Sequence, residues 1–179
     1  VSLKGHFGTN ELQVFRFNGF TLQLLASRNF GLNTLHCVRW HPYANYLATA
    51  ASSGMELQTW FFDSNLNSIN EIDHANIGSA QALAWSNNGS YLAVGLKNSK
   101  FLHIYPTNNG ILSTVILGDY AAGNVSVQDN AISWHNSDEF IAVGAQEFGD
   151  DLFIFSFDGN VLEKSESVSL SIGVNALDW

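Results

Sequence analysis

Apolar and polar positions alternate along the chain in a pattern that occurs four times. Each copy contains a short apolar stretch ending in tryptophan, at Trp40, Trp85, Trp134 and Trp179, with intervals of 45, 49 and 45 residues. Two positions before the tryptophan stands an aliphatic residue: Val38, Leu83, Ile132 or Leu177. Three positions before it stands a small one: Cys37, Ala82, Ala131 or Ala176. A period of two predicts a β-strand, and the small residues indicate that this strand is crowded from both sides.

Three more strands are predicted within each copy. A polar break follows the tryptophan, at 41–45, 86–90 and 135–139, and leads into an aromatic-led strand at Tyr46–Ala50, Tyr91–Gly95 and Phe140–Gly144. The third strands are Glu11–Phe17, Glu56–Phe62, Phe101–Tyr105 and Asp151–Phe157. Hairpin signals such as Asn18-Gly19 and Asp158-Gly159 follow them. The fourth strands are Phe20–Ala26, Leu66–Ile72, Ile111–Leu117 and Asn160–Val168.

Four short strands in 45 to 49 residues are the content of one β-propeller blade. We therefore predict an all-β fold, a partial β-propeller of four-stranded antiparallel blades in which residues 1–179 form one region. Its divisions are a partial blade at 1–30 with strands two to four, blades at 31–76, 77–125 and 126–171, and a first strand at 172–179. The two part-blades could close a ring of four, but about eight residues of the seam are missing in the repeat register. An excerpt of a longer propeller is the favoured interpretation.

The repeat resembles the WD40 repeat, in which a tryptophan, a polar turn, a Tyr-Leu-Ala-x-Gly strand and a Leu-x-Ile-Tyr strand succeed one another. The matching stretches are Leu83–Tyr105, Ile132–Phe155 and Val38–Trp60. The Trp-Asp pair of that family is absent, and its Gly-His dipeptide has no regular counterpart. Aromatic residues end the third strands instead, and we expect their packing to replace the missing bracing: Phe15, Trp60, Tyr105 and Phe155. TolB-type propellers are a second family with a similar repeat.

Composition and charge disfavour several classes of function. The net charge is −9 and the seven lysines and arginines are scattered, so no nucleic-acid partner and no membrane partner are expected. Cys37 is the single cysteine, which excludes an intrachain disulfide and a multi-cysteine metal site. We predict no cofactor and no metal. The sequence opens without Met and does not indicate a compartment.

Two groups of polar residues are weighed as ion sites. His41 and His135 each follow a tryptophan, and turn hydrogen bonds are favoured there over a metal site. Glu147, Asp150 and Asp151 form an acidic loop, where a solvated surface is favoured over Ca²⁺ binding. Three further histidines share no repeat position or ligand spacing and are interpreted as incidental: His36, His74 and His103.

The longest irregular segment, Gly118–Asn130, carries most of the extra length of the 49-residue interval. Loops on one face of a propeller usually carry recognition, so Asp119, Tyr120 and Asn124 are predicted to bind a partner. A neutral insertion explains the segment equally well.

The WD40 resemblance implies a function as a non-enzymatic scaffold that binds a protein or a peptide. No phosphate loop, nucleophile elbow or paired catalytic carboxylate is present in the sequence, and we therefore predict that the chain is not an enzyme. The alternative is a propeller enzyme or small-ligand binder, of the hydrolase, lactonase or TolB-like type. That alternative predicts a polar, ligand-sized pocket at the central channel.

Overall fold

The computed structural model describes residues 11–29, 34–52, 54–97, 101–118, 126–146, 150–170 and 173–179. Regular secondary structure in these segments consists of β-strands alone. None of the described residues belongs to a helix with the length and apolarity needed to cross a membrane.

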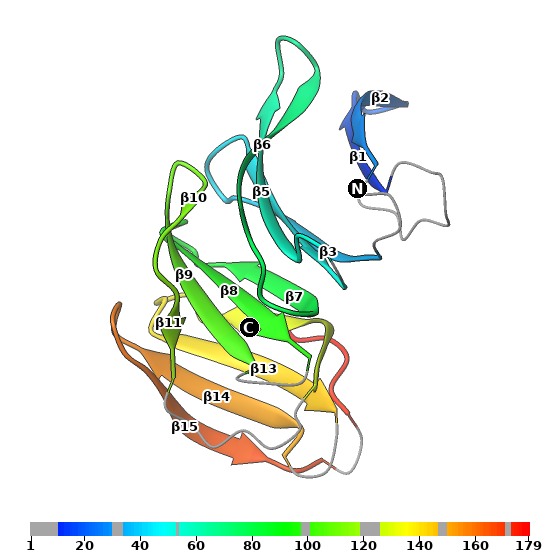
Figure 1. The fold of residues 1–179 in the computed structure, drawn as a ribbon. Helices are drawn as coiled ribbons and strands as arrows, with labels where there is room; N and C mark the ends of the chain where they lie inside the picture. The colour runs from blue at the N-terminus through cyan, green and yellow to red at the C-terminus, as the bar shows by residue number, and fades with distance from the viewer. Residues whose placement is uncertain are drawn as a thin grey trace.

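Four antiparallel sheets follow one another along the chain (Figure 1). The first is a hairpin of β1 (Leu12–Phe17) and β2 (Leu22–Arg28). The second contains, in order, β3 (Leu35–Trp40), β4 (Tyr46–Ala51), β5 (Leu57–Asp63) and β6 (Ser68–Ala75). The third contains β7 (Ala80–Trp85), β8 (Tyr91–Leu96), β9 (Leu102–Asn108), β10 (Ile111–Leu112) and β11 (Ile116–Leu117). The fourth contains β12 (Ser126–Trp134), β13 (Phe140–Gln146), β14 (Leu152–Phe157) and β15 (Leu162–Val168).

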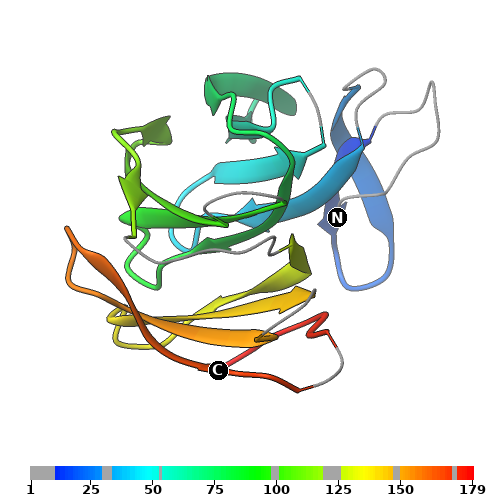
Figure 2. The same ribbon diagram turned by 60° about the horizontal axis from the view of Figure 1, so that its bottom comes forward.

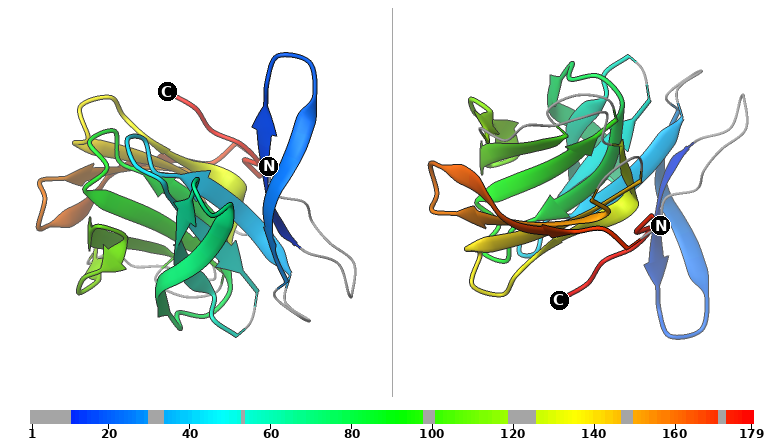
Figure 3. Two further views of the ribbon diagram at one scale, coloured as in Figure 1. Left: turned by 90° about the horizontal axis from the view of Figure 1, so that it is seen from above. Right: turned by 90° about the horizontal axis from the view of Figure 1, so that it is seen from below.

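The strand that ends in tryptophan is the first strand of each larger sheet. These inner strands, β3, β7 and β12, lie against one another, and the outer strands of each sheet fan away from them. The sheets therefore form a row, with the hairpin β1–β2 at one end and β14–β15 at the other (Figures 2 and 3).

The core lies between neighbouring sheets, where the apolar residues of facing strands pack together. Leu12 and Val14 of β1 share one cluster with Trp60 of β5, between the first and second sheets. Two further clusters fill the next two gaps, each centred on the small and aliphatic residues of the inner strands and their neighbours. Blade-on-blade packing of this kind buries apolar surface that no single sheet could cover.

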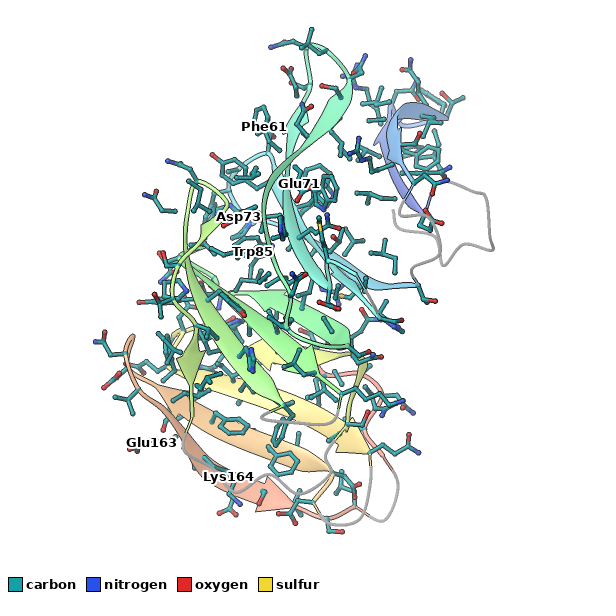
Figure 4. All side chains as sticks on the ribbon, viewed as in Figure 1. Phe61, Glu71, Asp73, Trp85, Glu163 and Lys164 are labelled. Atoms are coloured by element: carbon teal, nitrogen blue, oxygen red, sulfur yellow. The ribbon has the colours of Figure 1, made fainter. Side chains whose placement is uncertain are left out.

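Polar contacts reinforce the junction between the second and third sheets. The carboxylate of Asp73 on β6 accepts a hydrogen bond of 2.9 Å from the backbone N–H of Leu112. The hydroxyl of Thr59 donates a bond of 2.6 Å to the carbonyl of Gly110. Asp73 and Trp85 lie at this junction, as Figure 4 shows.

Apart from shifted strand ends, and from β12, which begins at Ser126 within the segment Gly118–Asn130 predicted to be irregular, the structure differs from the predicted strands in two places. The fourth strand of the third sheet is not continuous over Ile111–Leu117 but divides into β10 and β11, with an interruption at 113–115. The strand predicted at 172–179 is not formed here, because residues 173–179 have no ladder partner among the described residues. A strand needs such a partner for its backbone N–H and C=O groups.

Candidate functional site

Each inner strand has an irregular register near its start: a one-residue β-bulge in β3 and β7, and a longer interruption in β12. The register shifts between Leu35 and Cys37 in β3, between Ala80 and Ala82 in β7, and between Val127 and Ile132 in β12. A bulge leaves an extra residue out of the ladder and changes the direction of its side chain, which is why bulges are common beside active sites. The three irregularities occur at the same end of the inner strands, so they place irregular, polar positions together.

A pocket of about 460 Å³ lies at this end, between the third and fourth sheets. We call it the bulge-end pocket, and its lining is Gln81, Lys97, Ser126, Val127, Gln128 and Gln146. Three carboxamides, one hydroxyl and one ammonium group therefore converge on a volume that suits a small molecule. Among these described lining residues, none carries a carboxylate or an imidazole.

Backbone and side-chain hydrogen bonds hold the walls of the bulge-end pocket. The N–H of Lys97 donates a hydrogen bond of 2.9 Å to the carbonyl of Ser79, and Lys97 also forms an isolated β-bridge with Ser126 of the next sheet. The side chain of Gln81 donates a bond of 2.6 Å to the hydroxyl of Ser79. Polar groups held in this way are pre-oriented, which reduces the entropy lost when a ligand binds.

Gly95 of β8 allows the two sheets to approach closely beside the pocket. A Cβ atom at Gly95 would lie 2.5 Å from a methyl carbon of Val127 and 2.8 Å from Cδ1 of Ile132. Only a residue without a side chain fits against β12 at this distance.

The second sheet has a histidine and a serine where the third sheet has Gln81 and Lys97. His36 is the bulged residue of β3, and Ser52 directly follows β4 as Lys97 follows β8. Nε2 of His36 lies 2.6 Å from Oγ of Ser52. This contact gives His36 a defined side-chain partner, which its position in the sequence did not indicate.

Two other cavities lie away from this end. One of about 420 Å³ lies where the tryptophan ends of the inner strands meet, and it is lined in part by Arg39, Trp85 and Asp178. Another of about 670 Å³ is lined by the turn 137–140 and by the hairpin of β14 and β15. The second is larger, but it belongs to turns and outer strands. We prefer the bulge-end pocket because the fixed polar groups of two inner strands converge there.

The repeat tryptophans differ in burial. Trp134 is 5% exposed and Trp85 is half-buried, but Trp40 and Trp179 are 42% and 50% exposed. In the described part of the chain, no inner strand precedes β3 to cover Trp40, and Trp179 has no sheet of its own. These two therefore do not belong to the buried core.

The aromatic residues at the ends of the third strands are mostly buried. Trp60, Tyr105 and Phe155 are at most 5% exposed, whereas Phe15 is half-buried. The indole N–H of Trp60 also donates a buried hydrogen bond of 2.9 Å to the hydroxyl of Thr49. That these aromatic residues replace the bracing of WD40 blades stays a prediction.

His41 takes part in a turn contact between blades. Its Nδ1 accepts a hydrogen bond of 3.1 Å from the N–H of Tyr43, and its Nε2 lies 3.1 Å from the carbonyl oxygen of Gly89 in the next blade. The ring also contacts Trp85 edge-on, with centroids 5.0 Å apart. His135 makes the corresponding edge contact with Trp179, at 4.9 Å.

Two members of the acidic loop have hydrogen-bond donors as neighbours. Asp151 accepts a bond of 2.7 Å from the N–H of Leu170, and Asp150 accepts one from the hydroxyl of Ser167. Glu147 lies outside the described residues, as do the predicted partner-binding residues Asp119, Tyr120 and Asn124. In the segments that the structure describes, no group of three or more His, Cys, Asp and Glu residues is placed to hold a metal ion.

Comparison with known proteins gives structural neighbours but no sequence relatives. No protein-family model matches the chain, and no curated protein matches it. A protein of known structure from Lactobacillus plantarum superimposes with a TM-score of 0.71 at 15% identity, over 88% of this chain and 50% of its own. The periplasmic gluconolactonase of Pseudomonas aeruginosa gives 0.68 at 14% identity, over 88% and 50%. A candidate 6-phosphogluconolactonase from Bacteroides uniformis gives 0.62 at 15% identity, over 76% and 41%.

The fold is an all-β, propeller-type fold, with four- and five-stranded antiparallel sheets after the N-terminal hairpin. This confirms the predicted fold class. The chain spans about half the length of the solved structures that it matches. Membership of the WD40 family does not follow, because no family model matches.

The neighbours also correct the predicted function. The prediction of a non-enzymatic, protein-binding scaffold is contradicted by neighbours that are named as lactonases. The prediction that the chain is not an enzyme is contradicted by the same finding. Both predictions were inferred from the repeat, and a blade repeat reports the architecture that binding and catalytic propellers share. The alternative, with a site at the channel, agrees better with these neighbours.

Proposed function

We propose that this chain forms part of a propeller enzyme that hydrolyses small sugar lactones, and that the bulge-end pocket binds the substrate. The observation that carries the proposal is the convergence of Lys97 with Gln81, Gln128 and Gln146 on about 460 Å³. The lactonase names of two structural neighbours supply the substrate class. In this proposal, the WD40-like pattern accounts for the register of the strands in each blade and carries no information on function.

The lining chemistry suits a polyhydroxylated molecule. Each carboxamide offers two N–H donors and a carbonyl acceptor, so it can bond a sugar hydroxyl in either sense. The ammonium of Lys97 provides a point charge for the lactone carbonyl oxygen or for the carboxylate formed on hydrolysis. Gln81 and Ser126 are less than a tenth exposed, which limits the water that competes for these groups.

A binding experiment tests the role of the pocket directly. Isothermal titration calorimetry of the 179-residue chain with D-glucono-1,5-lactone, and with gluconate as the stable product, measures affinity. We expect Lys97→Met and Gln81→Leu each to weaken binding about tenfold or more, because each removes a hydrogen bond to the ligand. Lys164→Met is the matched control, since Lys164 lies on the outer strand β15 and should leave affinity unchanged.

Hydrolysis is measured separately, in a pH-stat, as the rate above the spontaneous opening of the lactone. Equal affinity in the wild-type chain and both pocket variants, or no binding at all, would contradict the proposed site.

A further inference from the structure

His36 and Ser52 form a close pair at the bulged end of the second sheet, β3–β6. Oγ of Ser52 lies 2.6 Å from Nε2 of His36 and 3.5 Å from the carbonyl oxygen of Thr34. The first distance is a short hydrogen bond and the second is at the limit of one, so the imidazole is the principal partner of the hydroxyl. Both residues are half-buried, so each keeps part of its surface exposed.

The backbone holds the two side chains in place. His36 is the residue that the bulge of β3 removes from the ladder, between the paired residues Leu35 and Cys37. The N–H of Ser52 donates a hydrogen bond of 3.1 Å to the carbonyl of Thr34, which fixes the start of the loop after β4. The contact is therefore made between β3 and the residue that follows β4, at a sequence separation of 16 residues, and not within one turn.

We propose that Ser52 is a nucleophile for acyl transfer and that His36 is its general base. A serine hydroxyl becomes nucleophilic when a base within hydrogen-bond reach accepts its proton, and the observed distance meets that requirement. The lactone as substrate rests on the proposed function above, whereas the reactivity of Ser52 does not. The site that we assign is thus a reactive serine in the second sheet, at the same end of the inner strands as the bulge-end pocket.

The chemical steps balance without an added co-reactant. Oγ of Ser52 attacks the acyl carbon while its proton passes to Nε2 of His36. The ring C–O bond of the lactone breaks, and the departing oxygen takes that proton and becomes a hydroxyl. Water then attacks the Ser52 ester, with His36 accepting a proton and returning it to Oγ. The net reaction adds one water to one lactone and gives a hydroxy acid.

A second histidine–serine contact in the chain provides a matched control. Nδ1 of His135 lies 2.9 Å from Oγ of Ser137, but the same nitrogen accepts the N–H of Ser137 at 3.2 Å, and Oγ accepts the N–H of Glu139 at 3.3 Å. That serine belongs to a turn whose backbone already uses both groups. It should therefore show no enhanced reactivity.

Covalent labelling with a fluorophosphonate probe tests the assignment. Oγ of the reactive serine displaces fluoride from phosphorus and the base takes the proton, so intact-mass spectrometry counts the adducts and peptide mapping locates them. We expect one adduct, at Ser52. Ser52→Ala should abolish it, His36→Gln should slow it about 100-fold or more, and Ser137→Ala should leave it unchanged. Glutamine already occupies the equivalent bulged position as Gln81, so His36→Gln keeps a side chain that this position accommodates.

The outcomes separate this assignment from the proposed lactone pocket. Labelling at Ser52 with no lactone affinity would support the nucleophile and reject the lactone. Circular dichroism first checks that the wild-type chain is folded. If that folded chain forms no adduct, the assignment is overturned. An equal rate for Ser52→Ala or for His36→Gln would also overturn it. Lactone affinity would then still report on the bulge-end pocket by itself.

Discussion

The indole N–H of Trp134 donates a hydrogen bond of 3.0 Å to the backbone carbonyl of Ala84, the residue before the tryptophan of the preceding blade. The same bond recurs at the other two junctions of this kind, from Trp85 to Arg39 at 3.1 Å and from Trp179 to Ser133 at 3.0 Å. Trp85 and Trp134 thus tie their own inner strands to the inner strand before, and Trp179 ties the C-terminal segment to β12. A buried indole N–H normally has a hydrogen-bond acceptor. Because the repeat interval is nearly constant, the same backbone carbonyl of the preceding repeat is in place each time.

Replacement of Trp134 separates this hydrogen bond from packing. Trp134→Phe keeps an aromatic ring but leaves the Ala84 carbonyl without its donor, so we expect stability to fall by about 1–3 kcal/mol. Trp134→Ala also removes a large buried side chain and should cost about 3–5 kcal/mol. Urea denaturation measures both changes. Trp40→Ala is the control, and its loss should be smaller because Trp40 is 42% exposed. Equal losses of stability for Trp40→Ala and Trp134→Ala would contradict the role of Trp134 in joining β12 to β7.

Gly95 gives a second test of how closely the blades pack. The Cβ atom of Gly95→Ala would overlap the methyl groups of Val127 and Ile132, so we expect a loss of about 1–3 kcal/mol in thermal or urea denaturation. Val127→Ala makes room for the new methyl group. The double variant should therefore lose less stability than the two single changes added together. Strict additivity would show that β8 and β12 are not in close contact at this point.

Much of the fold could be predicted from the sequence because the tryptophan interval is a local, repeated signal. The alternation before Trp85, the polar turn after it and the aromatic start at Tyr91 specify a register that the structure reproduces. The same signal led to the predicted strand at 172–179, of which the described residues 173–179 form no strand. Its formation depends on partner strands, which a periodic pattern does not report.

The candidate site was much harder to predict. His36 and Ser52 lie 16 residues apart, and their contact depends on a bulge that a strict period of two does not anticipate. Lys97 and Gln128 come from different blades, so only the approach of β8 and β12 brings them to one pocket. The available signal was the polar residue that interrupts each inner strand near its start, at His36 and Gln81.

Asp138 joins the turns of the third and fourth sheets, and its removal should loosen them. Its carboxylate accepts hydrogen bonds from the N–H of Asn87 at 2.6 Å and from the N–H of Asn88 at 2.9 Å. We expect Asp138→Ala to cost about 1–3 kcal/mol in urea denaturation. Asp138→Asn should cost less, because it keeps one carbonyl acceptor and tolerates the left-handed backbone, with φ of 60°. A larger loss for Asp138→Asn than for Asp138→Ala would contradict this account.

Tyr105 should make stability fall at alkaline pH. Burial raises the pKa of Tyr105 above its ordinary value of 10.0, because the phenolate is poorly solvated inside the protein. Above about pH 10 the unfolded chain releases this proton while the folded chain retains it. The folded state then binds more protons, and stability declines as pH rises.

Urea denaturation at about pH 9 and about pH 11 should show this decline in the wild-type chain and a smaller one in Tyr105→Phe. Tyr43→Phe changes a tyrosine that is 77% exposed and should retain the wild-type decline. An unchanged slope in Tyr105→Phe would show that the phenol of Tyr105 ionises as readily in the folded chain as in the unfolded one.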